Sequence, residues 1–262
     1  MEYKYIKSSQ YLSDKVIVIT GGTKGVGRAF AEIAGLEGAK VVISGRDEKT
    51  GNEIVNDIHK FGSEAIFVTA DLLKISNIRN LFKTCFEKFG RLDGLFYYAG
   101  VTPISPLDTC DEKTFDMVMD VNFKACFFAC QEAIHYMRMN NGGSIVLTGS
   151  SHAWSGQKDR AAYACSKGAE GILMEHIAHN YASEFIRCNY LTLGWTATEG
   201  EIALRESLGE SEDQLRKRAS EILPMGRMLE RNDYMDPLLY LFSDASAMMT
   251  GSVLRVTGGE YI

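Results

Sequence analysis

Residues 16–27 read VIVITGGTKGVG, an apolar run followed directly by a glycine-rich turn. The run Val16–Thr20 has the β-branched composition of a buried strand, and residues 26–37 have the pattern of a helix. Glycines in such a turn permit a tight bend and a close approach of the backbone to a phosphate. A strand, a glycine turn and a helix N-terminus therefore predict a dinucleotide site. The alternative is that the glycines serve packing alone.

The same alternation of strand and helix continues along the chain. We expect further strands at 40–44, 65–69, 92–98, 144–148, 186–193 and 253–256, and helices at 49–61, 75–89, 112–139 and around Tyr163. Short, continuously apolar strands between helices predict an α/β fold with a parallel sheet covered on both faces. Because the chain has only four prolines and no linker-like segment, residues 1–262 are expected to form a single domain.

Composition limits the classes of function. The 262 residues carry a formal net charge of −6, which argues against a general nucleic-acid binder. No apolar run approaches the roughly 18 residues of a membrane helix, and the N-terminus lacks a signal-peptide core, so we expect a cytoplasmic protein with no membrane partner. The six cysteines lack metal-ligand spacing and are expected to be reduced. His176 and His179 share a helix without a third ligand, so no metal site is expected.

Tyr163 and Lys167 lie four residues apart, and Ser150 precedes the tyrosine by thirteen. On a helix this spacing places the phenol and the ammonium on one face. A cation beside a phenol favours the phenolate, so such a tyrosine can exchange a proton with a substrate near neutral pH. Ser150 is the candidate for a hydrogen bond to the reacting oxygen, with Ser151 as the competing serine.

Arg46 and Lys24 bear on the choice of cofactor. A site for NAD needs a carboxylate about 20 residues after the glycine turn, where it binds the ribose 2′-hydroxyl. The second expected strand instead runs into Gly45 and Arg46, which offers a guanidinium to a 2′-phosphate. This pattern predicts NADP(H), with NAD(H) as the alternative. It also remains open that both cations are simply solvated, or that Asp47 pairs with Arg46.

These residues together resemble the classical short-chain dehydrogenase/reductase family over nearly the whole chain. The matching positions are the TGxxxGxG turn, Asp71, Ala99-Gly100, Asn122, Ser150, Tyr163-x-x-x-Lys167, Gly194 with Thr198, Thr250-Gly251 and Gly258-Gly259. The resemblance implies a Rossmann-like, doubly wound parallel sheet of about seven strands with helices on both faces. It also implies an oxidoreductase that transfers hydride between NADP(H) and an alcohol or carbonyl substrate, with Tyr163 as general acid/base.

The resemblance assigns further roles. Asn122, Ser150, Tyr163 and Lys167 would form the catalytic tetrad, with Asn122 holding a water that links Lys167 to solvent. Family members commonly assemble through two long helices, so a homotetramer or a dimer is expected. The residues expected to bind cofactor are Gly21, Thr23, Lys24, Gly25, Val26, Gly27, Arg46, Asp71, Leu72, Ala99, Gly100, Tyr163, Lys167, Gly194, Thr196 and Thr198. Asp71 would contact the adenine, unless it is a loop or helix-capping aspartate.

The sequence departs from the family at Tyr97-Tyr98, which replace two asparagines, and at Leu193, which replaces a proline. The departure at the tyrosines puts the packing of that loop in doubt. His152 and Trp154 are candidates for the substrate pocket, and residues 199–225 are expected to fold over it as a lid. The substrate stays open. Alternatives from other classes are a noncatalytic dinucleotide sensor and a nucleotide-sugar epimerase or dehydratase, which the short chain and glycine spacing disfavour.

Overall fold

The computed structural model describes residues 11–154 and 156–260. Seven parallel strands form one sheet, in the order β3-β2-β1-β4-β5-β6-β7. Along this order the strands are β3 (Ala65–Thr69), β2 (Lys40–Gly45), β1 (Val16–Thr20), β4 (Gly94–Tyr97), β5 (Gly143–Ser150), β6 (Ile186–Leu193) and β7 (Val253–Val256). The predicted doubly wound sheet is confirmed. The strand order reverses between β1 and β4, where such sheets form a crevice beyond the carboxyl ends of the strands.

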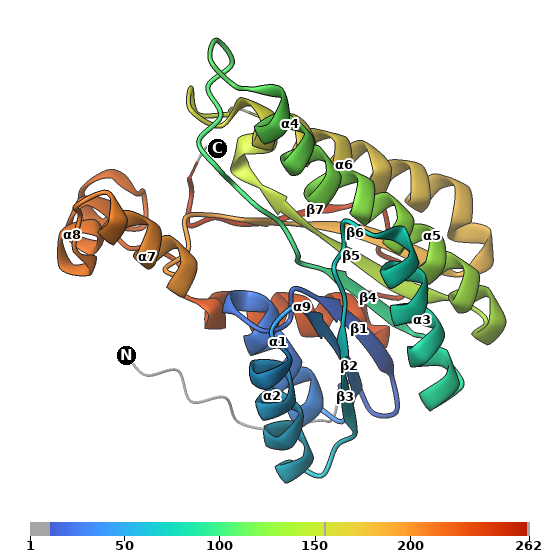
Figure 1. Cartoon of the computed structure of the whole chain (residues 1–262). Helices are drawn as coiled ribbons and strands as arrows, with labels where there is room; N and C mark the ends of the chain where they lie inside the picture. Colours follow the sequence, from blue (N-terminus) through green and yellow to red (C-terminus); the bar gives the residue numbers. More distant parts are fainter. Residues whose placement is uncertain (1–10, 155, 261–262) are drawn as a thin grey trace.

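Helices cover both faces of the sheet (Figure 1). Alternate side chains of a strand point to opposite faces of the sheet. Both faces of β1 are covered, so side chains pointing either way are buried. One face is covered by α1 (Gly25–Leu36), α2 (Glu48–Lys60) and α9 (Met235–Phe242), and the other by α3 (Ile75–Phe89), α4 (Glu112–Val118), α5 (Ala125–Met137) and α6 (Ala161–Tyr181). Ile17 and Ile19 belong to the buried cluster on the first face, whereas Val16 and Val18 belong to the cluster on the second.

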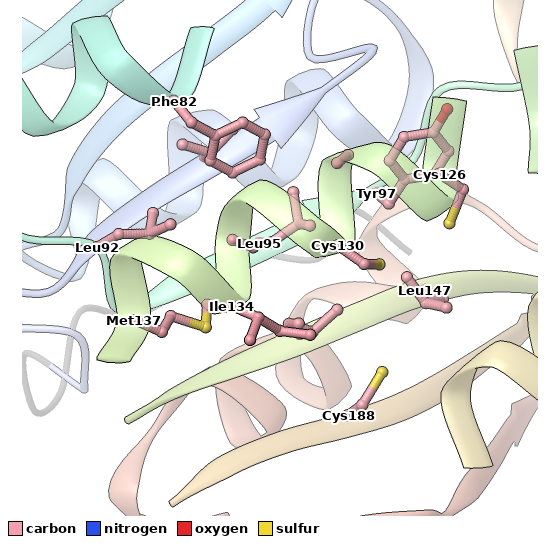
Figure 2. Packing of buried hydrophobic residues seen from close by; sticks show 14 of the residues in the cluster. Phe82, Leu92, Leu95, Tyr97, Cys126, Cys130, Ile134, Met137, Leu147 and Cys188 are labelled. Atoms are coloured by element: carbon pink, nitrogen blue, oxygen red, sulfur yellow. The ribbon is translucent and has the colours of Figure 1, made fainter. Parts of the chain in front are cut away.

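Four of the cysteines, Cys85 among them, belong to the core cluster beneath α5. Figure 2 shows Cys126 and Cys130 on α5 and Cys188 on β6 among the apolar side chains of this layer. Burial raises the pKa of Cys126 and of Cys188 well above the ordinary value, so both remain neutral thiols that pack like small apolar groups. All six cysteines are free, as predicted.

The predicted long helix around residues 112–139 is present but is interrupted by a π-helical turn. Helix α4 ends at Val118, a π-helical turn spans Met119–Lys124, and α5 begins at Ala125. The π turn carries the buried Asn122, whose Nδ2 donates to the Val101 carbonyl at 3.0 Å and to Ser166 Oγ at 3.0 Å. These contacts come from distant segments, so the local periodicity of the sequence does not reveal the wider turn.

Helices α7 (Glu199–Ser207) and α8 (Glu212–Ile222) project from the sheet (Figure 1). They have a small apolar cluster of their own, made by Leu215, Ala219, Leu223 and Met228. The expected lid is therefore a pair of helices beside the carboxyl ends of the strands. Of the helices in the described ranges, none has the length and apolarity needed to cross a membrane.

Candidate active site

A cavity of about 1010 Å³ lies beyond the carboxyl ends of the strands. It reaches from the glycine turn to the two projecting helices. Of the predicted site residues, its walls include Gly21, Thr23, Lys24, Gly25, Arg46, Asp71, Leu72, Ala99, Gly100, Ser150, His152, Tyr163, Lys167, Gly194, Thr196 and Thr198. The predicted residues that do not line it are Val26, Gly27, Asn122 and Trp154.

The glycine turn is held close to the loop that follows β4. Gly21 has a φ of +67°, and a Cβ there would lie 3.0 Å from the Cα of Ala99. A Cβ on Gly27 would lie 2.6 Å from Cδ1 of Tyr98. Both glycines are therefore required by the packing of the protein itself, as well as being suited to a close approach by phosphate.

Tyr97 and Tyr98, which replace the two asparagines of the family, are well packed at the end of β4. Tyr97 is buried, and its hydroxyl donates to the Val121 carbonyl at 2.7 Å. The backbone N–H of Tyr98 donates to Thr20 Oγ1 at 3.1 Å, and the Tyr98 hydroxyl accepts from the Val26 N–H at 3.4 Å. This N–H belongs to the first turn of α1, where helices lack internal acceptors. The two tyrosines thus tie β1, α1 and the π turn together.

At the far end of the cavity, Asp47 does not neutralise Arg46. The Asp47 carboxylate caps α2 by accepting from the Thr50 N–H at 3.1 Å and from Thr50 Oγ1 at 2.7 Å. In the described part of the chain, Arg46 has no hydrogen-bonding or ion-pair partner, and its side chain is exposed at the cavity wall. Asp71 accepts from the Leu73 N–H at 3.2 Å, as a loop aspartate would, and it also lines the cavity.

Tyr163 and Lys167 lie one turn apart on α6, with Lys167 Nζ 5.8 Å from the centre of the Tyr163 ring. Ser150 ends β5, is 6% exposed and lines the same cavity. Its Oγ accepts from the His152 N–H at 3.2 Å. The His152 ring packs edge-on against Tyr163 at 5.8 Å, and burial, aided by Arg160, lowers the histidine pKa, so His152 is neutral at physiological pH.

Glu170 was not predicted as a site residue. Its carboxylate accepts from Lys167 Nζ at 2.9 Å and 3.1 Å, and Lys167 also donates to the Thr148 carbonyl at 2.8 Å. Burial raises the pKa of Glu170 to about 7, although the Lys167 ammonium opposes that change. The signal in the sequence was a carboxylate three residues after the lysine, a spacing at which helical side chains meet.

The side of the cavity nearest the projecting helices is built on Gly194 and the residues after it. Thr196 Oγ1 donates to the Gly194 carbonyl at 2.8 Å and lies 2.6 Å from the Tyr234 hydroxyl. Thr198 caps α7 by accepting from the Glu201 N–H at 3.2 Å. Trp154, in contrast, is 54% exposed and lies beneath the Arg255 guanidinium, 4.9 Å from its ring centre.

Residues 15–209 match the family model of the short chain dehydrogenases. The chain belongs to the short-chain dehydrogenase/reductase family. As a member, it is an oxidoreductase that acts on CH–OH or C=O groups, and the noncatalytic alternative is set aside. The family uses NAD(H) or NADP(H).

Similar proteins align over nearly the whole chain. An uncharacterised oxidoreductase of Thermotoga maritima is 34% identical, with 94% of this chain and 97% of the relative aligned. An L-rhamnose 1-dehydrogenase (NAD(P)(+)) of Azotobacter vinelandii is 31% identical over 96% of this chain and 98% of its own. The structure of a short-chain type dehydrogenase/reductase from Mycobacterium marinum superposes with a TM-score of 0.87 at 26% identity, covering 96% of this chain and 97% of that one.

Within residues 11–154 and 156–260, no group of three or more His, Cys, Asp or Glu side chains is placed to hold a metal ion. His176 instead interacts with Asn180, whose Nδ2 donates to the His176 carbonyl at 2.8 Å.

Proposed function

We propose that this enzyme transfers hydride between NADP(H) and an alcohol or carbonyl substrate, with Tyr163 as the general acid/base. The observation that carries the proposal is one continuous cavity, with the glycine turn and Arg46 at one end and Ser150, Tyr163 and Lys167 at the other. A phosphate-binding end and a proton-transfer end in one cavity match the needs of this reaction.

The residues present fit the cofactor. Gly21 and Gly25 leave the turn without side chains beside the N-terminus of α1, which favours a pyrophosphate. Thr23, Asp71, Leu72, Ala99 and Gly100 would line the adenosine half, with Val26 and Gly27 behind them. Gly194, Thr196 and Thr198 would lie along the nicotinamide half, where the bound cofactor supplies or accepts the hydride. Ser44 Oγ, in the cavity wall, has no hydrogen-bond partner among the described residues.

The side chains at the catalytic end divide the proton chemistry. In carbonyl reduction Tyr163 donates its hydroxyl proton to the substrate oxygen, and in oxidation its phenolate accepts that proton. Ser150 hydrogen-bonds the same oxygen as negative charge develops on it. The Lys167 ammonium stabilises the phenolate form of Tyr163. Asn122, with its amide bonded to Val101 and Ser166, would hold the π turn against α6, and the water assigned to it remains a prediction.

The choice of NADP(H) rests on Arg46 and Lys24 at the adenosine end. Replacing Arg46 with Ala should weaken NADP(H) binding by about 1.5–3 kcal/mol, or about 10- to 150-fold, because a charge-assisted hydrogen bond to the 2′-phosphate is lost. NAD(H) affinity should hardly change. Calorimetric titration of both cofactors measures this, with Arg79→Ala on α3 as the matched control. An equal loss for both cofactors would show that Arg46 does not bind the 2′-phosphate, and the NAD(H)-dependent alternative would then stand.

The substrate would enter between the catalytic residues and the lid of α7 and α8. Trp195 contacts both helices of the lid. Its indole N–H donates to Glu201 Oε1 on α7 at 2.7 Å, and its ring lies 4.6 Å from the Arg218 guanidinium on α8. His152 lines this part of the cavity and would contact the substrate. Trp154 lies outside the cavity walls, so a substrate contact by Trp154 would need a rearrangement of its loop.

We also propose a homo-oligomer, either a tetramer or a dimer. Phe115 on α4, Phe127 on α5 and Ile172 on α6 are 45%, 42% and 68% exposed, on the long helices of one face. Exposed apolar groups on neighbouring helices are typical of a surface that a second copy covers. Light scattering at micromolar concentration should give a multiple of the 29.1 kDa chain mass. A strictly monomeric mass would contradict the proposal.

The reaction itself is tested by a substrate screen. Ketones, sugars, polyols and hydroxysteroids are incubated with the enzyme and each nicotinamide cofactor, and absorbance of the reduced nicotinamide is followed. We expect turnover with at least one alcohol or carbonyl compound, and faster turnover with the NADP(H) pair. Binding of cofactor without turnover of any compound in the screen would count against the proposed chemistry.

A further inference from the structure

The neighbourhood of Lys167 contains a buried counter-ion that lies away from the cavity. Glu170 is 0% exposed and Lys167 is 3% exposed. The two oxygens of Glu170 and the Thr148 carbonyl lie 2.8–3.1 Å from Lys167 Nζ. An ammonium has three N–H groups, and the carboxylate and the carbonyl can be served by two of them, which leaves the third for a ligand. The head of the lysine is therefore held by Thr148, at the cavity wall, and by Glu170, which does not line the cavity.

Charge at this position depends on Glu170. Burial favours the neutral amine of Lys167, but the carboxylate of Glu170, together with Tyr163, outweighs it and raises the lysine pKa above its usual value. The other titratable groups facing the pair are Tyr163 on α6, Cys126 and Cys130 on α5, Tyr97 on β4, Tyr98 directly after it and Tyr190 on β6. Burial raises the pKa of Tyr97, Tyr98, Cys126 and Tyr190, and that of Cys130 is raised as well, so these five stay neutral. In the described chain, Glu170 is the one carboxylate that forms an ion pair with Lys167.

We propose that Glu170 is a positioning residue of this active site, which keeps Lys167 an ammonium and aims its side chain. This inference rests on the proposed function, because the ammonium matters only if Lys167 stabilises the Tyr163 phenolate. Without the carboxylate, a lysine this deeply buried loses its proton more easily. A neutral amine cannot stabilise the phenolate electrostatically, and a lysine released from Glu170 is free to rotate away from Tyr163.

The direct test follows the protonation of Lys167 in the free protein, so it needs no substrate. The full chain is labelled with [ε-13C]lysine, and the Lys167 signal is assigned as the one missing from Lys167→Met. Its NMR titration is compared between the wild type and Glu170→Gln, which removes the charge while retaining an amide oxygen that can accept the hydrogen bond. The midpoint should move to lower pH by about one unit or more, the usual size of a neighbouring-charge effect. Glu170→Met removes the same charge with an apolar side chain and gives the same comparison if Glu170→Gln does not fold.

Two controls separate charge from structure. Glu170→Asp retains the carboxylate and should keep the Lys167 midpoint closer to that of the wild type than Glu170→Gln does. Glu175→Gln removes an exposed carboxylate from the same helix and should leave the midpoint unchanged. An unchanged midpoint in Glu170→Gln, or in Glu170→Met where only that variant folds, would overturn the inference.

Turnover gives a second readout. With an active compound from the screen, the fall in activity at high pH should begin at lower pH in Glu170→Gln than in the wild type. The difference in pH should be similar to the shift of the Lys167 midpoint. If the wild type turns over no compound but the Lys167 midpoint still shifts, the assigned interaction stands and the proposed function fails. If the wild type is active and neither the midpoint nor the pH profile shifts, the proposed function stands and this inference fails.

Discussion

Replacing Tyr163 with Phe should lower turnover by about 100-fold or more, the usual contribution of general acid–base catalysis. The substitution removes the hydroxyl and nearly preserves the shape of a side chain that packs against His152. Cofactor affinity should therefore persist, and the loss should appear in kcat. Steady-state kinetics and cofactor titration on the same preparation separate the two effects.

Tyr181→Phe is a suitable control for this substitution. Tyr181 ends the same helix, outside the cavity walls, where its ring lies 5.4 Å from the Arg138 guanidinium. It should retain the turnover of the wild type. A Tyr163→Phe enzyme with near-normal turnover on its best substrate would show that another group transfers the proton.

Lys167→Ala should reduce turnover further than Tyr163→Phe does, because Lys167 is expected both to stabilise the Tyr163 phenolate and to bind the cofactor. Cofactor binding should weaken as well, and the pH profile of alcohol oxidation should move to higher pH, since the phenolate loses its neighbouring cation. Cofactor titration and pH–rate measurements on residual activity test these effects. Unchanged cofactor affinity would show that Lys167 does not bind the cofactor.

Stability has to be measured alongside, because Lys167→Ala leaves Glu170 buried without its partner. Breaking a buried ion pair from one side costs about 3–5 kcal/mol. Urea unfolding shows whether the variant is folded under assay conditions, and Lys49→Ala, at an exposed position on α2, is the matched control. A folded Lys167→Ala enzyme with wild-type turnover would contradict the assigned role.

The framework of the fold was predictable because its signals are local. The apolar runs that became β1, β3, β6 and β7 were predicted with the bounds that the structure shows, as was α3. Burial on both faces explains the apolar run of β1, which is buried at every position. The predicted strand over residues 92–98 is shorter in the structure, where β4 spans Gly94–Tyr97.

The parts of the site that escaped prediction depend on contacts between distant segments. Tyr97 was a source of doubt, yet its hydroxyl reaches the carbonyl of Val121, in a π turn that sequence periodicity does not show. From the sequence, Glu170 is not distinguishable from an exposed charged residue of a helix, because no neighbouring residue indicates that this face of α6 is buried. Thr196 was expected to bind cofactor, and only the fold shows that its hydroxyl lies 2.6 Å from that of Tyr234.

Hydride transfer in the cavity that joins the glycine turn to Tyr163 is tested most directly with NADPH deuterated at C4 of the nicotinamide. Each of the two epimers is used with the best carbonyl compound from the screen. We expect the carbinol carbon of the product to gain deuterium from one epimer only, and Tyr163→Phe to make the same labelled product far more slowly. A product without deuterium from either epimer, formed at the wild-type rate, would contradict it.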